Sequence, residues 1–211
     1  MKGAARGPAG PPLGAGSRDA RRLICPTLTG SVMCPRAAMN RPSERPEPSP
    51  RQDADEGFMR EALEHGRRGL AAGEVPIGAV IVIDGVVVAR AHNAPIALSD
   101  PTAHAEVLAL RAAAEKVGNY RLPGATLYAT VEPCAMCCGA ALQARIARLV
   151  YGARDPKAGA VESLHRLLDD ARLNHRVQTR GGVLADESAA LLSEFFETRR
   201  RRDRGGVAEP G

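Results

Sequence analysis

Several features that are common in membrane and secreted proteins are missing from this chain of 211 residues. No apolar run reaches the roughly 18 residues that a membrane-spanning helix needs, so we expect no span and no membrane partner. The five cysteines are too few and too unevenly spaced for a disulfide-rich secreted scaffold. The basic start of the chain is not followed by an apolar segment, which excludes a secretory signal.

Aromatic residues are scarce, at 3% with no tryptophan, and none lies in the first 52 residues. That segment instead holds 6 glycines and 9 prolines. Such a composition cannot bury enough apolar surface to offset the entropy of ordering, so we predict that residues 1–52 form a disordered extension. Two other interpretations stay open. The segment also resembles an organelle transit peptide, or it reflects a mis-assigned start, with Met39 as a later candidate.

The formal net charge of +5 is unevenly distributed. Residues 1–52 carry +6 and residues 199–211 carry +3, which leaves −4 for residues 53–198. The basic balance therefore belongs to the two ends, and the central part is not a generally basic RNA binder. We expect any RNA affinity to come from a local surface, chiefly Lys157 and Arg199–Arg202.

The rest of the chain has the hydrophobic pattern of one α/β domain, which we place at 53–204, followed by a disordered tail at 205–211. We expect helices at 58–73, 104–117, 135–144 and around the apolar stripe Leu191, Leu192, Phe195 and Phe196, and strands at 79–83, 86–89, 125–130 and 146–151. The Asp84-Gly85 pair between two β-branched runs predicts a hairpin with a type I′ turn. The near-continuous apolarity of these two runs indicates that helices cover both faces of the sheet.

Three residues have the chemistry and spacing of a metal site: His104, Cys134 and Cys137. A Cys-x-x-Cys at a helix start places both sulfurs on one face, and the helix N-terminus favours the ligating thiolate. One histidine and two cysteines supply three corners of a tetrahedral zinc site, and catalytic zinc keeps the fourth for water. A closed structural site would need a further ligand, for which His92 is the least implausible, whereas Cys138 should point away and pack.

Glu106 lies two residues after His104 and completes the pattern. On a regular helix it would face away, but at a first turn capped by Asp100 or Thr102 both residues can flank one point. A carboxylate beside a zinc-bound water can accept its proton and pass it to a leaving group. The combination of His-x-Glu with a later Pro-Cys-x-x-Cys is the signature of zinc nucleobase deaminases.

At these residues the chain resembles the bacterial tRNA-specific adenosine deaminases, and the likeness covers about 59–200. It includes the segments 74–80, 92–93, 100–106, 119–122, 125–128, 151–159, 174–177, 182–187 and 195–196. The resemblance implies a three-layer cytidine-deaminase-like α/β fold, in which helices cover both faces of a mixed five-stranded sheet. It further implies a cytoplasmic homodimer with one zinc per subunit, which converts adenosine 34 to inosine in the anticodon stem-loop of an arginine tRNA.

The resemblance also assigns roles to single residues: zinc binding to His104, Cys134 and Cys137, proton transfer to Glu106, nucleoside contact to Asn93, contact with loop nucleotides to Asp155 and Lys157, and part of the RNA surface to Phe196. Simpler roles stay open, because Asn93 and Asp155 could be turn residues and Phe196 could belong to the core. Cys138 stands where the family often has a smaller residue.

Two rival functions remain open. The first is deamination of a free nucleobase or nucleotide, such as guanine or cytosine, on the same fold. The second is a non-catalytic zinc module that only binds RNA or a partner subunit. Glu106 argues against the second, because a purely structural site has no use for that carboxylate.

Overall fold

The computed structural model describes residues 50–205. Of the segments predicted to be disordered, 1–52 and 205–211, residues 1–49 and 206–211 lie outside the described residues. Gly205 is the last residue of helix α5, so the prediction is wrong for this residue. Helix α1 begins at Pro50, so the last three residues of the predicted 1–52 extension are helical instead. Within the described range, no helix combines the length and the apolarity needed to cross a membrane.

The described elements form a mixed five-stranded sheet with helices on both faces, as expected. In chain order they are α1 (Pro50–Ala71), β1 (Gly78–Ile83), β2 (Val86–His92), α2 (Pro95–Leu98), α3 (Ala105–Val117), β3 (Thr126–Val131), α4 (Ala135–Gln143), β4 (Arg148–Ala153), the 3-10 helix η1 (Leu167–Asp169), β5 (Gln178–Arg180) and α5 (Ala185–Gly205). The strand order is β2-β1-β3-β4-β5. β1 runs antiparallel to both its neighbours, whereas β3, β4 and β5 are parallel.

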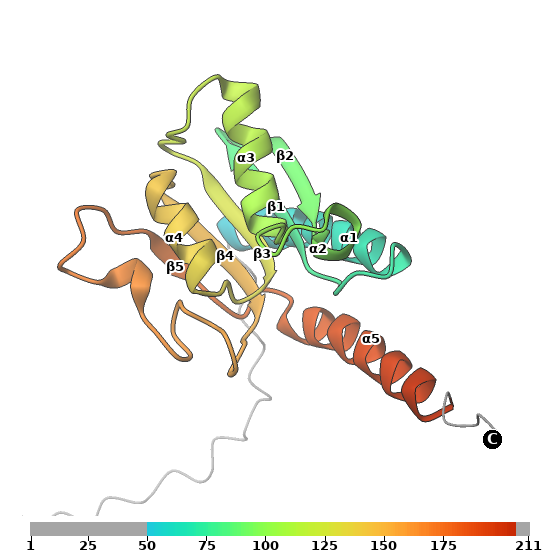
Figure 1. Ribbon diagram of the computed structural model, residues 1–211. Coiled ribbons are helices and arrows are strands. Elements are labelled where there is room, and N and C mark those ends of the chain that lie inside the picture. The colour runs from blue at the N-terminus through green and yellow to red at the C-terminus, as the bar shows by residue number, and fades with distance from the viewer. Residues whose placement is uncertain (1–49, 206–211) are drawn as a thin grey trace, which may run out of the picture. The chain divides into compact units, whose positions relative to one another are not determined.

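Alternating side chains of β1 enter two separate cores, which makes the domain three layers thick. Ala79 and Ile81 pack in the core that α3 and α4 cover. Val80 and Val82 pack on the opposite face, in the core that contains residues of α1. Figure 1 shows α3 and α4 in front of the sheet and α1 behind it.

The predicted hairpin is present, but one of its strands is less buried than expected. Asp84 and Gly85 have φ angles of 50° and 75°, and a type I′ turn requires positive φ at both positions. β1 is buried along almost its whole length, as predicted. The prediction is wrong for β2, which lies at the edge of the sheet and leaves Val86 65% exposed.

A buried carboxylate ties α1 to the far end of the sheet. Asp55 is 1% exposed and accepts two hydrogen bonds of 2.7 Å from Arg148 and one of 2.5 Å from Arg180. It also accepts one of 2.9 Å from Tyr128. Burial alone would raise the pKa of Asp55, but these hydrogen bonds hold it below the usual value.

The Asp55→Asn variant is expected to lose about 2–3 kcal/mol of unfolding free energy, because it leaves two partly buried arginines without their charged acceptor. Urea unfolding at pH 7 measures this loss. Since the folded pKa of Asp55 is depressed, its stabilisation is present at neutral pH and disappears as the pH falls through that pKa. The difference between wild type and variant should therefore shrink in acid, and a difference independent of pH would contradict the assignment.

Candidate functional site

The predicted zinc ligands lie where two helices begin. His104 is the N-cap residue of α3, and Cys134 is the N-cap residue of α4. Cys137 follows in the first turn of α4, and its side chain is fully buried. α4 follows β3, whereas α3 follows the short helix α2. The partial positive charge at each helix start favours thiolate and other anionic groups.

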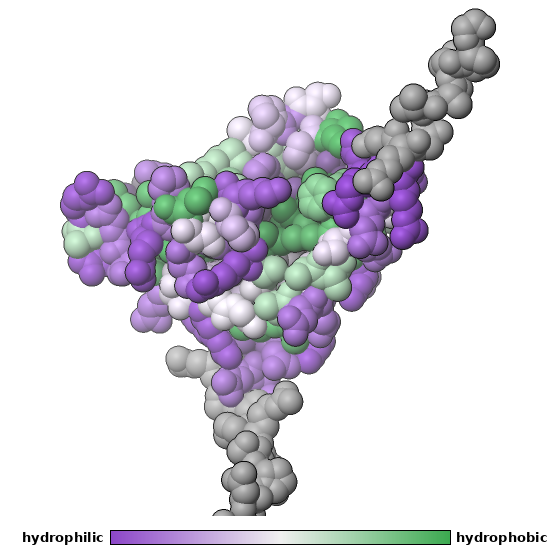
Figure 2. All heavy atoms as spheres, turned by 90° about the horizontal axis from the view of Figure 1, so that it is seen from below, coloured by the Kyte–Doolittle hydropathy of each residue, from purple (hydrophilic) through white to green (hydrophobic). Residues whose placement is uncertain are grey.

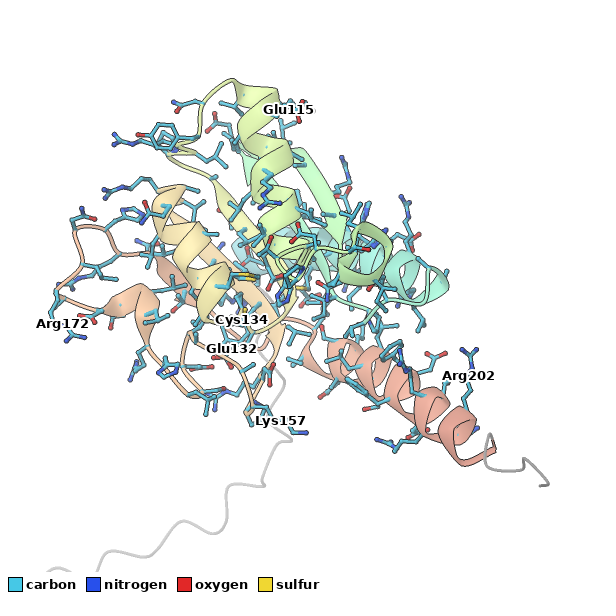
Figure 3. All side chains as sticks on the ribbon, viewed as in Figure 1. Glu115, Glu132, Cys134, Lys157, Arg172 and Arg202 are labelled. Carbon is cyan, nitrogen blue, oxygen red and sulfur yellow. The ribbon has the colours of Figure 1, made fainter. Side chains whose placement is uncertain are left out.

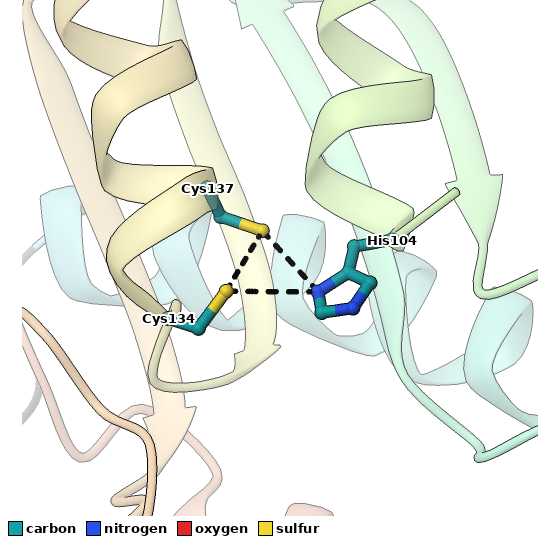
Figure 4. A group of neighbouring side chains, drawn as sticks. All are labelled: His104, Cys134 and Cys137. Atoms are coloured by element: carbon teal, nitrogen blue, oxygen red, sulfur yellow. Dashed lines mark hydrogen bonds between the residues drawn. The ribbon is translucent and has the colours of Figure 1, made fainter. Parts of the chain in front are cut away.

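The three ligand atoms are spaced as a tetrahedral zinc ion requires. His104 Nδ1 lies 3.7 Å from Cys134 Sγ and 3.5 Å from Cys137 Sγ, and the two sulfurs are 3.6 Å apart (Figure 4). Zinc–sulfur bonds near 2.3 Å and zinc–nitrogen bonds near 2.0 Å predict separations of about 3.5–3.8 Å between ligands of a tetrahedron. Among the described residues, no further histidine, cysteine or carboxylate joins this group. The side chains therefore fit zinc and leave one corner for a non-protein ligand.

The three clustered side chains shift one another's pKa values. Hydrogen bonds from Cys137 and His104 lower the pKa of Cys134 to about 3. The neighbouring Cys134 and burial raise the pKa of Cys137. The interaction with Cys134 also raises the pKa of His104. Thiolate and neutral imidazole are the forms that bind a divalent cation, so metal binding at these side chains would release protons.

His92 and Cys138, which were considered but not favoured as ligands, do not belong to the cluster. His92 Nδ1 is 2.8 Å from the carbonyl oxygen of Asn93, not in the cluster. Cys138 is fully buried with its Sγ 3.6 Å from the carbonyl oxygen of Pro133, and burial raises its pKa to about 12. Its predicted role as a packed thiol is confirmed.

Glu106 is a buried carboxylate next to Cys137, and one of its two oxygens has no hydrogen-bond partner among the described residues. It is the second residue of α3 and 3% exposed, and Oε2 is that oxygen. Burial raises its pKa. An unsatisfied buried polar atom costs about 1–3 kcal/mol, so this arrangement needs a reason outside stability. A proton-transfer group beside a metal site is such a reason.

The predicted capping of α3 by Asp100 or Thr102 is wrong. Asp100 Oδ1 instead accepts hydrogen bonds of 2.7 Å from the backbone N–H and the hydroxyl of Thr102, so these two residues form their own turn. The side chain of His104 makes no capping hydrogen bond, because its ring faces the cysteines.

Asn93 performs the capping from a distant part of the chain. It directly follows β2 and is 5% exposed, and its Oδ1 accepts a 2.8 Å hydrogen bond from the backbone N–H of Ala105. Ala105 lies between His104 and Glu106 in the chain, so this bond places the Asn93 amide close to both residues. The turn-residue alternative for Asn93 does not describe this long-range contact.

The other predicted substrate residues meet at a groove of about 390 Å³. Its lining comprises Val75, Ile77, Val131, Arg154, Asp155, Pro156, Lys157, Leu192 and Phe196. Phe196 is 46% exposed, so the alternative that it belongs to the core is wrong; the neighbouring Phe195 is buried instead. Asp155 Oδ1 accepts hydrogen bonds from the N–H groups of Lys157 and Ala158, so this residue does shape a turn. In the view from below, apolar side chains lie in the middle of the face with hydrophilic ones around them (Figure 2).

Two buried glutamates beside the site were not anticipated. Glu74 Oε1 accepts hydrogen bonds of 2.9 and 2.8 Å from the N–H groups of Ile96 and Ala97, which fixes α2. Glu132 accepts hydrogen bonds from a loop that follows β4. The only sequence signal for Glu132 is its position just before the Pro-Cys-x-x-Cys segment.

Comparison with known proteins gives consistent matches. The MafB19-like deaminase family matches residues 53–200. A tRNA-specific adenosine deaminase of Haemophilus influenzae is 49% identical over 151 residues, covering 71% of this chain and 87% of that protein. A tRNA-specific adenosine deaminase of Bacillus subtilis is 45% identical over 148 residues, covering 70% and 92%.

A solved structure from a study of A-to-I editing by tRNA:A34 deaminases at the wobble position is also similar. It is 49% identical with a TM-score of 0.63, and the match covers 64% of this chain and 99% of that chain. These relatives are matched over most of their length, and the family match at 53–200 spans the three candidate metal ligands. The chain therefore belongs to the family of tRNA-specific adenosine deaminases.

Proposed function

We propose that this chain deaminates adenosine to inosine at wobble position 34 of a tRNA anticodon loop, with an arginine tRNA as substrate. One observation carries the proposal: the buried Glu106 carboxylate, whose Oε2 has no hydrogen-bond partner among the described residues, lies on the same helix start as His104, one of three side chains spaced as zinc ligands. A metal-binding module without catalysis would leave that carboxylate unexplained. The names and the similarity of the relatives indicate the substrate.

His104, Cys134 and Cys137 would hold one zinc ion per subunit. When bound, zinc supplies catalysis by lowering the pKa of a water molecule to roughly 7. Glu106 would accept one proton from that water and donate it to N1 of adenine. It would then accept the second proton of the same water, from the hydroxyl group added at C6, and deliver it to the amino group, which leaves as ammonia. The burial of Glu106 keeps bulk water from competing for these protons.

Asn93 would orient the base. Its Oδ1 is occupied by the N–H of Ala105, so the Nδ2 group is the part that can donate to the flipped nucleoside. The base must leave its stack, which costs less in a single-stranded loop than in a duplex. The groove between Phe196, Asp155 and Lys157 would accept the neighbouring nucleotides, with the exposed Phe196 ring available for stacking.

We infer further that the chain acts as a homodimer in the cytoplasm. Ile96 and Leu98 on α2 are 67% and 57% exposed, which provides apolar surface for a second subunit. The family membership supports the same assembly and location. Sedimentation of the zinc-loaded chain tests the dimer.

The rival function, deamination of a free base, is tested by comparing the activity of the chain on separate substrates. The zinc-loaded full chain is incubated separately with an arginine-tRNA anticodon stem-loop, guanine, cytosine and cytidine. We expect inosine at position 34 and no ammonia release from the free compounds. A stem-loop with its adenosine moved to position 35 is the matched control and should stay unmodified. Ammonia release from guanine without inosine in RNA would replace the proposed function by its rival.

A further inference from the structure

Glu132 is a buried carboxylate that the proposed reaction does not use. It follows directly on β3 and precedes Pro133 and the ligand Cys134. Its side chain is 2% exposed. An acidic side chain is rarely this buried unless hydrogen bonds compensate the lost hydration.

The carboxylate of Glu132 binds both ends of one loop. Oε1 accepts hydrogen bonds from the N–H groups of Val161, Glu162 and Ser163 at 3.1, 2.8 and 2.9 Å. Oε2 accepts one from the N–H of Asp155 at 3.2 Å and one from the Ser163 hydroxyl. Five donors from residues 155–163 thus converge on one side chain, and hydrogen bonds to a charged acceptor are stronger than neutral ones.

The same loop contacts the metal-binding segment directly. Cys134 and Gly159 pair as an isolated antiparallel bridge, and the N–H of Ala160 donates a 2.9 Å hydrogen bond to the carbonyl oxygen of Pro133. Gly159 must lack a side chain, because a Cβ there would lie only 2.4 Å from Cδ of Glu132. Figure 3 shows Glu132 beside Cys134, with Lys157 at the outer turn of the loop.

We propose that Glu132 is a positioning residue, which fixes the loop that carries Asp155 and Lys157 relative to Cys134 and thereby sets the affinity for RNA. This inference rests on the proposed function. A loop held in its binding position loses less entropy when RNA binds, so its anchor affects binding more than chemistry. Glu132 would act only through the loop, without touching the substrate.

The test is the Glu132→Gln variant of the zinc-loaded full chain, assayed on the anticodon stem-loop. Both oxygens of Glu132 accept hydrogen bonds from the loop, whereas a glutamine side chain has one acceptor oxygen and an NH2 group that only donates. The variant therefore loses the hydrogen bonds to one of the two oxygens. We expect KM to rise about tenfold, with kcat changed less than about twofold and the zinc content unchanged. Hydrogen exchange at residues 155–163 should accelerate.

Asp55→Asn is the matched control, because it also neutralises a buried, multiply hydrogen-bonded carboxylate, but at the far end of the sheet. At a temperature where both variants are folded, it should leave KM unchanged. Gly159→Ala adds a methyl group against the Glu132 carboxylate without changing the charge, so it should raise KM as well. Ser163→Ala removes only one hydroxyl and serves as the mild variant if Glu132→Gln does not fold.

A double-mutant cycle separates positioning from general destabilisation. If Glu132 acts through Lys157, the KM effects of Glu132→Gln and Lys157→Ala will combine to less than their product. Multiplicative effects, or an unchanged KM in an active Glu132→Gln variant, would overturn the inference. Inactivity of the wild-type chain would instead refute the proposed function, and the hydrogen-exchange comparison would still report whether Glu132 anchors the loop.

Discussion

Replacing Glu106 by glutamine is expected to lower kcat for inosine formation by about a hundredfold to ten-thousandfold, the usual contribution of a general acid–base group. The amide has nearly the same shape but cannot accept and release the proton. Because Oε2 has no partner to lose, the fold should not suffer. We therefore expect zinc content and thermal midpoint to match or exceed those of wild type, as often happens when a strained functional group is removed.

The measurement combines single-turnover inosine formation, elemental analysis and thermal unfolding. Glu115→Gln is the matched control, since Glu115 lies on the same helix but is exposed. It should behave as wild type in all three assays. An active Glu106→Gln variant would show that another group moves the proton.

Removing the imidazole in a His104→Ala variant is expected to abolish both zinc binding and activity. Nδ1 of His104 supplies one of three protein ligands, and two cysteines alone leave the ion with half of a tetrahedron. The zinc content should fall from about one per chain to near zero, and the thermal midpoint should fall because bound metal stabilises the folded state. Inductively coupled plasma analysis of the purified chain measures the metal.

His92→Ala is the matched control for this experiment. His92 is the histidine nearest to being a rival ligand, but its Nδ1 contacts the carbonyl oxygen of Asn93. The His92→Ala variant should keep its zinc. A His104→Ala variant that retains one zinc per chain, together with loss of zinc from His92→Ala, would reverse the assignment.

The cluster of His104, Cys134 and Cys137 was predictable from sequence because its residue types and spacing form a specific pattern, although the contact between the two segments spans 30 positions. Cys134 and Cys137 occupy one helix start, and the spacing of His104 and Glu106 needs only a second helix start nearby. The hairpin was equally predictable, since Asp84-Gly85 specifies the turn by its backbone preferences alone.

Features that depend on distant contacts were missed or misjudged. The exposure of β2 follows from its edge position, which its apolar residues do not reveal. β5 is three polar residues long, and Arg180 at its end reaches Asp55, 125 positions earlier in the chain. The side chain that caps α3 is Asn93, not the nearby Asp100, and no local sequence pattern predicts this contact.

Glu132 shows the same limit at the site itself. Its partners are mainly backbone N–H groups about 23 to 31 positions later, and a backbone N–H has no sequence signature. The position of Phe196 was open between core and surface, because helical spacing alone does not tell which of two adjacent aromatic residues is buried. The structure buries Phe195 and exposes Phe196.

Inosine formation at position 34 of an anticodon loop should depend on zinc held by His104, Cys134 and Cys137. The most direct measurement titrates zinc into the metal-free full chain and records inosine formed in an arginine-tRNA stem-loop at each occupancy. The rate should rise in proportion to zinc bound and level off at one zinc per chain. A chain with full zinc occupancy that leaves adenosine 34 unchanged would contradict the account.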